Sequence, residues 1–352
     1  MRGLSRQALK LVGLALALAL VAGASSALAY AGDKSLGGSH GSAQGGKQGQ
    51  TITVRTSIQT SVNGHTRDAR RTGNLSSADT NWTPPACWYE PAFSPKEIEA
   101  VVKGMRGLGA GAPFMGGIGA ALGNALDTYY KDGHPYKNYN LDKQGEGMFW
   151  ARVINPNRKD DPEAMACDRP PFWVDKGETP DEPLAASPAV LAAYAYDELP
   201  VPDTEFAMAP PSETKVNLPT WIWLEKAKFK KVSVTASIPG SGLSATTTAR
   251  PVSLTIDPGT ADAETFPTSG ECPIRGGRIG APRAKGTPAE TLPPCGVRYL
   301  RAPGQGDSYE LNATLTWRIS WTSTTGDRGG LPDGVYGAAR DVVVQEIQSV
   351  NR

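Results

Sequence analysis

The sequence offers few side chains that could carry out nucleophilic catalysis. Its 352 residues include 3 histidines, His40, His65 and His134, which are scattered along the chain. A serine or cysteine nucleophile needs a base close by, most often histidine, and an acid that orients the base. The 35 acidic residues could still supply a carboxylate pair for glycoside hydrolysis. We therefore predict no catalytic residue and keep an envelope hydrolase with a carboxylate pair as an alternative.

The cysteines are suited to disulfide bonds rather than to a metal. The chain contains 4 of them, Cys87, Cys167, Cys272 and Cys295, and it lacks the Cys-x-x-Cys spacing that is typical of zinc sites. Four cysteines allow three pairings. Pairing Cys87 with Cys167 and Cys272 with Cys295 keeps each bridge within one candidate domain. We predict these two disulfides and no zinc site.

A glycine-rich stretch over residues 107–123 invites comparison with phosphate-binding loops. A dinucleotide fingerprint must follow a buried strand, and a P-loop must end in Lys-Ser or Lys-Thr. This stretch meets neither condition, so we expect a loop or a short Ala/Gly-rich helix over residues 114–130, with no cofactor. The acidic run at residues 160–163 lacks the alternating oxygen ligands of a calcium loop. It predicts a solvated turn and no metal.

The 8 tryptophans occur in neighbouring sets. Two of these sets, Trp221 with Trp223 and Trp317 with Trp321, have spacings of two and four, which place both rings on one face of a strand. If exposed, the four rings would form an aromatic contact surface that stacks on sugars. If buried, they fill a core, which is the commoner role of such large rings. We favour the core and keep a glycan-binding, adhesin-like protein as an alternative.

The first residues predict export. The positive residues Arg2, Arg6 and Lys10 precede an apolar stretch over residues 11–21, and Ala27-Leu28-Ala29 forms a small-x-small cleavage site. The apolar stretch has about half of the ~20 residues needed to cross a bilayer. We therefore expect a signal peptide over residues 1–29, cleavage after Ala29, a secreted or wall-associated product, and no transmembrane segment in the mature chain.

Charge and composition narrow the partners and the fold. The formal net charge is +1, and removal of three positive residues with the signal peptide leaves the mature chain at −2. This near-neutral balance argues against a nucleic-acid partner. The 40 glycines and 29 prolines favour short strands and many turns. About 320 residues remain after cleavage, which predicts two domains.

The first half of the mature chain predicts a mixed α+β domain over residues 51–213. Residues 30–50 are rich in Gly, Ser and Gln and predict a disordered tether, and residues 51–58 alternate like a strand at a sheet edge. Ser94, Pro95 and Glu97 form a capping box before an apolar stripe that starts at Ile98. Ser187-Pro188 begins a second helix in the same way.

The second half, residues 214–352, predicts an all-β, immunoglobulin-like sandwich. Short strand-like runs cover residues 220–224, 231–238, 245–255, 296–301, 309–322 and 341–347. In residues 309–321 the odd positions are mostly apolar and the even ones mostly polar, so one face packs inward and the other meets solvent. The Leu331-Pro332-Asp333-Gly334 run predicts a loop.

Four segments resemble a family of uncharacterised secreted proteins of actinomycete bacteria. They are Pro84-Pro85-Ala86-Cys87-Trp88-Tyr89-Glu90-Pro91, Gly147-Met148-Phe149-Trp150, Pro171-Phe172-Trp173-Val174-Asp175 and Val216-Asn217-Leu218-Pro219-Thr220-Trp221-Ile222-Trp223-Leu224. In that family the Pro-Thr-Trp-x-Trp segment opens a domain similar to the PKD-type sandwich. The chain has Asp257-Pro258-Gly259 in place of the Asp-Gly-rich PKD turn, and residues 261–294 form a long insertion. The resemblance implies location and fold more than activity.

Together these features predict a non-enzymatic protein of the cell exterior. We expect a binding or structural module that contacts an unidentified protein or a cell-envelope polymer, without metal or cofactor.

Overall fold

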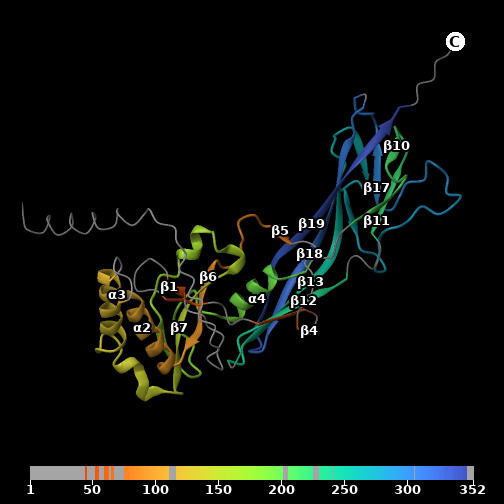
Figure 1. The fold of residues 1–352 in the computed structure, drawn as a ribbon. Helices are drawn as coiled ribbons and strands as arrows, with labels where there is room; N and C mark the ends of the chain where they lie inside the picture. The colour runs from red at the N-terminus through yellow and green to blue at the C-terminus, as the bar shows by residue number, and fades with distance from the viewer. Residues whose placement is uncertain are drawn as a thin grey trace, which may run out of the picture. The chain divides into compact units, whose positions relative to one another are not determined.

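The computed structural model describes residues 44–45, 52–54, 59–62, 65–66, 75–110, 116–200, 205–224, 230–239, 241–304 and 306–346. The predicted signal peptide lies outside these residues, as does the predicted tether except for the two residues of strand β1 (Gln44–Gly45). Residues 40–352 form one compact unit, and three sheets make up most of it (Figure 1). The fold is mainly β, with few helices.

The first sheet is built from early segments of the chain. Its strands lie in the order β1, β2 (Ile52–Val54), β7 (Gly147–Ile154) and β6 (Cys87–Phe93), and β8 (Phe172–Asp175) also pairs with β7. The strand expected over residues 51–58 therefore appears as β2. It lies one strand in from the edge, because β1 pairs with its outer side.

Two helices accompany the first sheet, α2 (Pro95–Ala110) and α3 (Gly116–Tyr130) (Figure 1). The predicted capping box of α2 is confirmed: the Ser94 N–H donates to Glu97 Oε2 at 2.7 Å, and the Glu97 N–H donates to Ser94 Oγ at 3.4 Å. Ile98 and Val102 are fully buried, as the apolar stripe predicts. The glycine-rich stretch contributes to α3, so the helical alternative is confirmed.

Three short 3-10 helices connect the elements of this region: Asn138–Lys143, Pro156–Arg158 and Pro162–Met165. The last one begins at the acidic run. Its N-cap is Asp161, whose carboxylate accepts a hydrogen bond from the Glu163 N–H at 2.9 Å. The run therefore forms a capped turn, as predicted.

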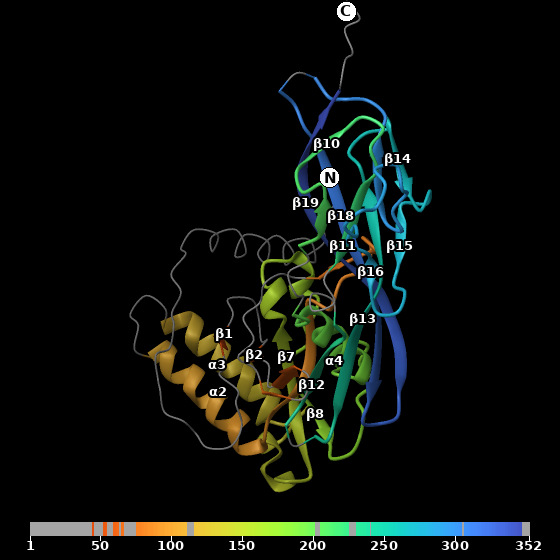
Figure 2. The same ribbon diagram turned by 90° about the vertical axis from the view of Figure 1, so that its right-hand side faces the viewer.

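The long sheet contains nine strands in the order β10, β19, β18, β13, β12, β3 and β4, with β15 beside β13 and β5 beside β19. Their bounds are β3 Gln59–Val62, β4 His65–Thr66, β5 Ser76–Ser77, β10 Glu213–Lys215, β12 Val232–Ser237, β13 Ser244–Asp257, β15 Glu271–Pro273, β18 Tyr309–Ser323 and β19 Arg328–Gln345. β13, β18 and β19 run side by side (Figure 2). Burial alternates along β18, as its sequence predicts.

The small sheet packs against part of the long sheet. Its strands are β14 (Ala263–Phe266), β17 (Gly296–Tyr299), β11 (Thr220–Leu224) and β16 (Ile279–Gly280) in that order, with β9 (Ala207–Ala209) beside β11. The ring of Tyr299 stacks on that of Tyr309 from β18, with centroids 5.2 Å apart. The predicted insertion thus supplies β14, β15 and β16.

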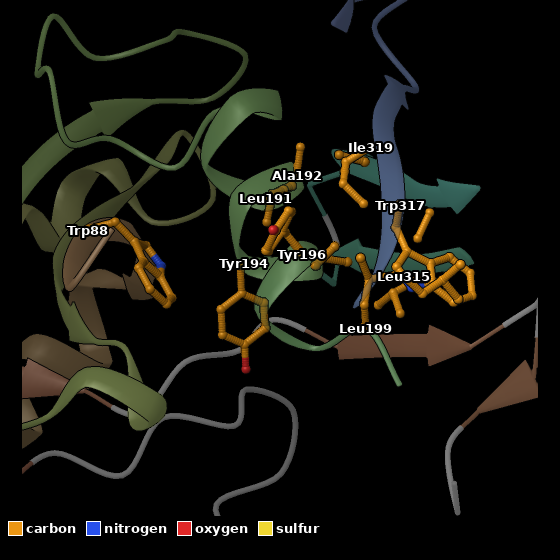
Figure 3. Packing of buried hydrophobic residues seen from close by; sticks show 14 of the residues in the cluster. Trp88, Leu191, Ala192, Tyr194, Tyr196, Leu199, Leu315, Trp317 and Ile319 are labelled. Carbon is orange, nitrogen blue, oxygen red and sulfur yellow. The ribbon is translucent and has the colours of Figure 1, made fainter. Parts of the chain in front are cut away.

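Helix α4 (Pro188–Asp197) is apolar on every side, and six of its ten residues are buried. A helix that is apolar all round must be covered all round. The ring of Tyr194 meets that of Trp88 in the first sheet at 5.4 Å, and the Thr247 hydroxyl of the long sheet donates to the Ala192 carbonyl at 2.8 Å. Figure 3 shows α4 between Trp88 and the β18 residues Leu315, Trp317 and Ile319.

Strand pairing crosses the expected boundary at Thr214, and it corrects the expectation of a loop at residues 331–334. β9, which precedes the expected boundary at Thr214, pairs with β11, which follows it. β3 likewise pairs with β12, so the sheets do not divide at that boundary. The run from Leu331 to Gly334 is not a loop but part of β19. Leu331 is paired with Ile319 and Gly334 with Trp317, so the two residues between them form a bulge, where proline is tolerated.

Candidate contact surface

Both predicted disulfides are present, with the predicted pairing. Cys87 and Cys167 have Cα atoms 6.0 Å apart, and Cys272 and Cys295 have Cα atoms 5.6 Å apart. All four cysteines are buried. Cys272 lies in β15 of the long sheet, while the Cys295 carbonyl accepts a hydrogen bond from the Ile222 N–H of the small sheet. The second bridge therefore links the two sheets.

The four tryptophans of the possible aromatic contact surface are buried to different degrees. Trp317 is 1% exposed and Trp221 is 9% exposed, and Trp223 and Trp321 are partly buried. Trp317 lies beside Leu315 and Leu199 in the core (Figure 3). The remaining four tryptophans are buried or partly buried as well. Trp88, Trp221 and Trp317 are thus buried, whereas the other five rings keep part of their surface exposed.

A pair of carboxylates closes the end of α4. The Asn157 side-chain amide donates to Asp197 Oδ2 at 2.9 Å and to Glu198 Oε1 at 3.0 Å. In the first sheet, the buried Glu90 accepts a hydrogen bond from Trp88 Nε1 at 2.8 Å. These carboxylates are engaged by the protein itself, which is a structural arrangement. Within the described part of the chain, no group of three or more His, Cys, Asp or Glu side chains could hold a metal ion.

The outer face of the long sheet carries two rows of hydroxyl groups. Thr247 points towards α4, so its neighbours Thr246 and Thr248 point to the opposite face. The register places Thr246 between Thr235 and Thr322, and Thr248 between Ser233 and Ser320. The hydroxyl oxygens of Thr235 and Thr246 are 2.8 Å apart, and those of Ser233 and Thr248 are 3.0 Å apart.

A row of cations follows the hydroxyl rows on the same face. Arg250 of β13 is directly opposite Arg318 of β18. Val232 is paired with Ala249, so the register places Lys231 beside Arg250 on its other side. All three residues are exposed. Opposite positions of neighbouring strands have Cβ atoms about 5 Å apart, and like charges there are destabilising.

None of these three cations has a compensating partner: within the described chain, no salt bridge or side-chain hydrogen bond involves Lys231, Arg250 or Arg318. We call the row and the two hydroxyl rows together the outer-face site. The sequence alone placed each residue in a strand-like run, but only the pairing of three strands brings the residues together.

Among the helices that the structure describes, none is long and apolar enough to span a bilayer. Comparison with known proteins finds no matching family model, no matching curated protein and no matching solved structure.

Proposed function

We propose that this protein is an exported, non-enzymatic binding module that acts through the outer-face site. The observation that carries the proposal is the row of Lys231, Arg250 and Arg318. Three like charges on adjacent strands repel one another, and they gain no compensation from the rest of the described chain. Such a row adds no salt bridge to the described fold, whereas it would attract a partner of opposite charge.

Export is supported by the disulfides and by the first 29 residues. Disulfides persist in oxidising compartments and are rare in the cytosol. Buried bridges of this kind act as structural cross-links rather than as reactive thiols. The signal-like layout of residues 1–29 supplies the route.

The fold proposal is an immunoglobulin-like sandwich of PKD type formed by the long and small sheets. The bridge between Cys272 and Cys295 supports it, because it joins the two sheets as the inter-sheet bridge of immunoglobulin domains does. Membership of the secreted actinomycete family belongs to the same proposal and rests on the sequence segments around Trp88, Trp150, Trp173 and Trp221.

Export is tested by expressing the full chain in a bacterium with a Sec pathway and separating the culture medium, envelope and cytoplasm. We expect a product outside the cytoplasm whose N-terminal residue is Tyr30 and whose denatured form has no free thiol. A cytoplasmic product with four free thiols would overturn the proposal.

The contact surface is tested by cosedimentation of the secreted protein with purified bacterial envelopes. We expect the protein to sediment with them, and we expect a double Arg250→Ser, Arg318→Ser variant to stay in the supernatant. The control is a Lys131→Ser, Lys159→Ser variant, which removes the same charge from exposed positions elsewhere. Equal sedimentation of all three proteins would show that the outer face is not the contact surface.

A further inference from the structure

The cation row does not stand alone, because a two-residue hairpin places two further arginines close to it. Arg275 and Arg278 exchange both backbone hydrogen bonds, at 2.9 and 3.0 Å. Between them Gly276 and Gly277 have φ angles of 57° and 72°, which are the left-handed values of a type I′ turn. Residues that exchange both bonds lie directly opposite each other, so the two arginine side chains project from the same side of the hairpin.

The register of β13 brings this hairpin to the cation row. One edge of β13 pairs first with β12, up to the pair of Ala249 with Val232, and then with β15, from the pair of Ser253 with Pro273. The Ile274 N–H donates to the Val252 carbonyl at 3.3 Å. The end of β15 and the start of β12 therefore flank the same few residues of β13, which include Arg250.

We define the cationic cluster as Lys231, Arg250, Arg275, Arg278 and Arg318. All five residues are exposed, and none of them takes part in a salt bridge with any described residue. Two of its pairs, Arg250 with Arg318 and Arg275 with Arg278, are arginines at directly opposite positions of paired backbone segments. The carboxylate of Glu271 lies four residues before Arg275 along the chain and forms no salt bridge with the cluster.

The cluster is local rather than a consequence of overall charge. The whole chain has 36 basic and 35 acidic residues, so its near-neutral charge does not by itself account for five cations gathered in one place. Arginine also has a planar fork of donors that grips carboxylate and phosphate groups in a bidentate way. Four arginines in one cluster thus favour an anionic ligand with such groups.

The neighbouring hydroxyl rows indicate which kind of anion fits. Serine and threonine hydroxyls both donate and accept hydrogen bonds, as sugar hydroxyls do. Sequence-tolerant binding of single-stranded nucleic acid relies on aromatic side chains that stack on bases, and the two hydroxyl rows and the cation row consist only of Ser, Thr, Lys and Arg. A stable protein interface has an apolar centre, which these rows do not supply.

We propose that the cationic cluster and the hydroxyl rows together bind a linear anionic polysaccharide. The arginines hold its carboxylate or phosphate groups, and the hydroxyl rows contact its sugar hydroxyls. This inference rests on the proposed function and names the class of its ligand. Repulsion within the two arginine pairs destabilises the free protein. Binding of an anionic ligand would offset that repulsion.

The test is a titration of the full mature chain with polygalacturonate, a linear carboxylated polysaccharide, against neutral dextran. We expect binding to polygalacturonate alone, with an affinity that falls as salt increases because counterions are released. The Arg250→Ser, Arg318→Ser variant and the Arg275→Ser, Arg278→Ser variant should each bind at least about tenfold more weakly, equivalent to about 1.4 kcal/mol. The Lys131→Ser, Lys159→Ser control should bind like the wild type.

A second variant separates sugar recognition from charge attraction. Thr246→Val with Thr322→Val leaves the charge unchanged, and we expect it to weaken binding to polygalacturonate several-fold. Thermal unfolding of every variant shows whether it is folded, and we expect no loss of stability in the arginine variants because each removes a repulsive pair.

The outcomes distinguish the inference from the proposed function. Three results would each overturn the polysaccharide assignment. They are equal binding of polygalacturonate and dextran, an affinity loss in the lysine control as large as in the arginine variants, and tighter binding of a single-stranded DNA oligonucleotide. If the protein still sediments with envelopes in an Arg250- and Arg318-dependent manner, the proposed function survives and only the ligand class is wrong. If the sedimentation fails while polygalacturonate binds, the ligand class stands and the envelope is not its source.

Discussion

Single side chains in this protein have properties set by burial. Burial raises the pKa of Tyr196 to about 12, and burial together with neighbouring tyrosines raises the pKa values of Tyr130 and Tyr299 above the usual value. A folded-state pKa above the unfolded value means that each of these tyrosines stays protonated to a higher pH in the folded protein than in the unfolded protein. The stabilisation is complete below pH 10 and is lost as the pH rises through the folded-state pKa.

Alkaline titration tests whether the pKa values of these buried tyrosines are raised. Between pH 10 and 12 the free energy of unfolding should fall by about 1.4 kcal/mol per pH unit for each such tyrosine. Ultraviolet absorbance of tyrosinate should show fewer ionised tyrosines at pH 11 in the native protein than in the urea-unfolded protein. Tyr196→Phe should reduce the slope of stability against pH by one group. Identical midpoints in native and unfolded protein would contradict the assignment.

The two disulfides should contribute unequally to stability. A bridge constrains the unfolded chain more when it closes a longer loop. The sequence separations are 80 for Cys87–Cys167 and 23 for Cys272–Cys295, which correspond to about 4.5 and about 3.5 kcal/mol in the chain-entropy account. Replacing each pair with serine and measuring urea unfolding should give the larger loss for the first pair. The reverse order would mean that the link between the two sheets outweighs loop length.

Residue types alone predicted part of the site. Paired cysteines follow from their even number and from the signal-like first residues, and buried tryptophans follow from their size. The pairing of Arg250 with Arg318 could not be predicted, because each residue occupies an ordinary polar position on a strand. Their proximity depends on which strands are neighbours and in which register, and neither is encoded locally.

Elements with local signals were predicted well. The capping serines before α2 and α4, and the alternation along β18, each act within a few residues of chain. The bulge in β19 was missed because Pro332 and Gly334 are typical of a loop, and only pairing with β18 on one side and β5 on the other keeps them in a strand. β3 pairs with β12, which lies far along the chain, and local patterns cannot show such a pairing.

Helix α4 should depend on its N-cap. Ser187 Oγ accepts a hydrogen bond from the Val190 N–H at 3.3 Å, and Pro188 follows at the first position. Ser187→Ala should lower the free energy of unfolding by about 1 kcal/mol, measured by chemical denaturation. Ser187→Asp keeps an acceptor and places a negative charge at the positive end of the helix, so it should retain most of the stability. An equal loss in both variants would show that the cap is unimportant.

At the scale of the whole molecule, the sheets make the two halves of the chain depend on each other. β3 pairs with β12, and β9 pairs with β11. Helix α4 covers the inner face of the long sheet, where its Ala192 carbonyl accepts a hydrogen bond from Thr247. A fragment of residues 214–352 lacks all three. Its inner face would expose buried residues such as Val234, Ala249 and Trp317 to water.

We therefore expect the fragment of residues 214–352 to fail as an independent domain. Val234 and Ala236 would lose their cover, and exposed apolar surface of this kind leads to association or to a loosely packed state. The near-ultraviolet circular dichroism of Trp221 and Trp317 should be lost, and the fragment should bind a hydrophobic dye. Residues 40–352 should instead unfold in one cooperative transition by calorimetry. A fragment that keeps the native tryptophan spectrum and unfolds cooperatively would support a domain boundary near Thr214, because its core would then be complete without α4.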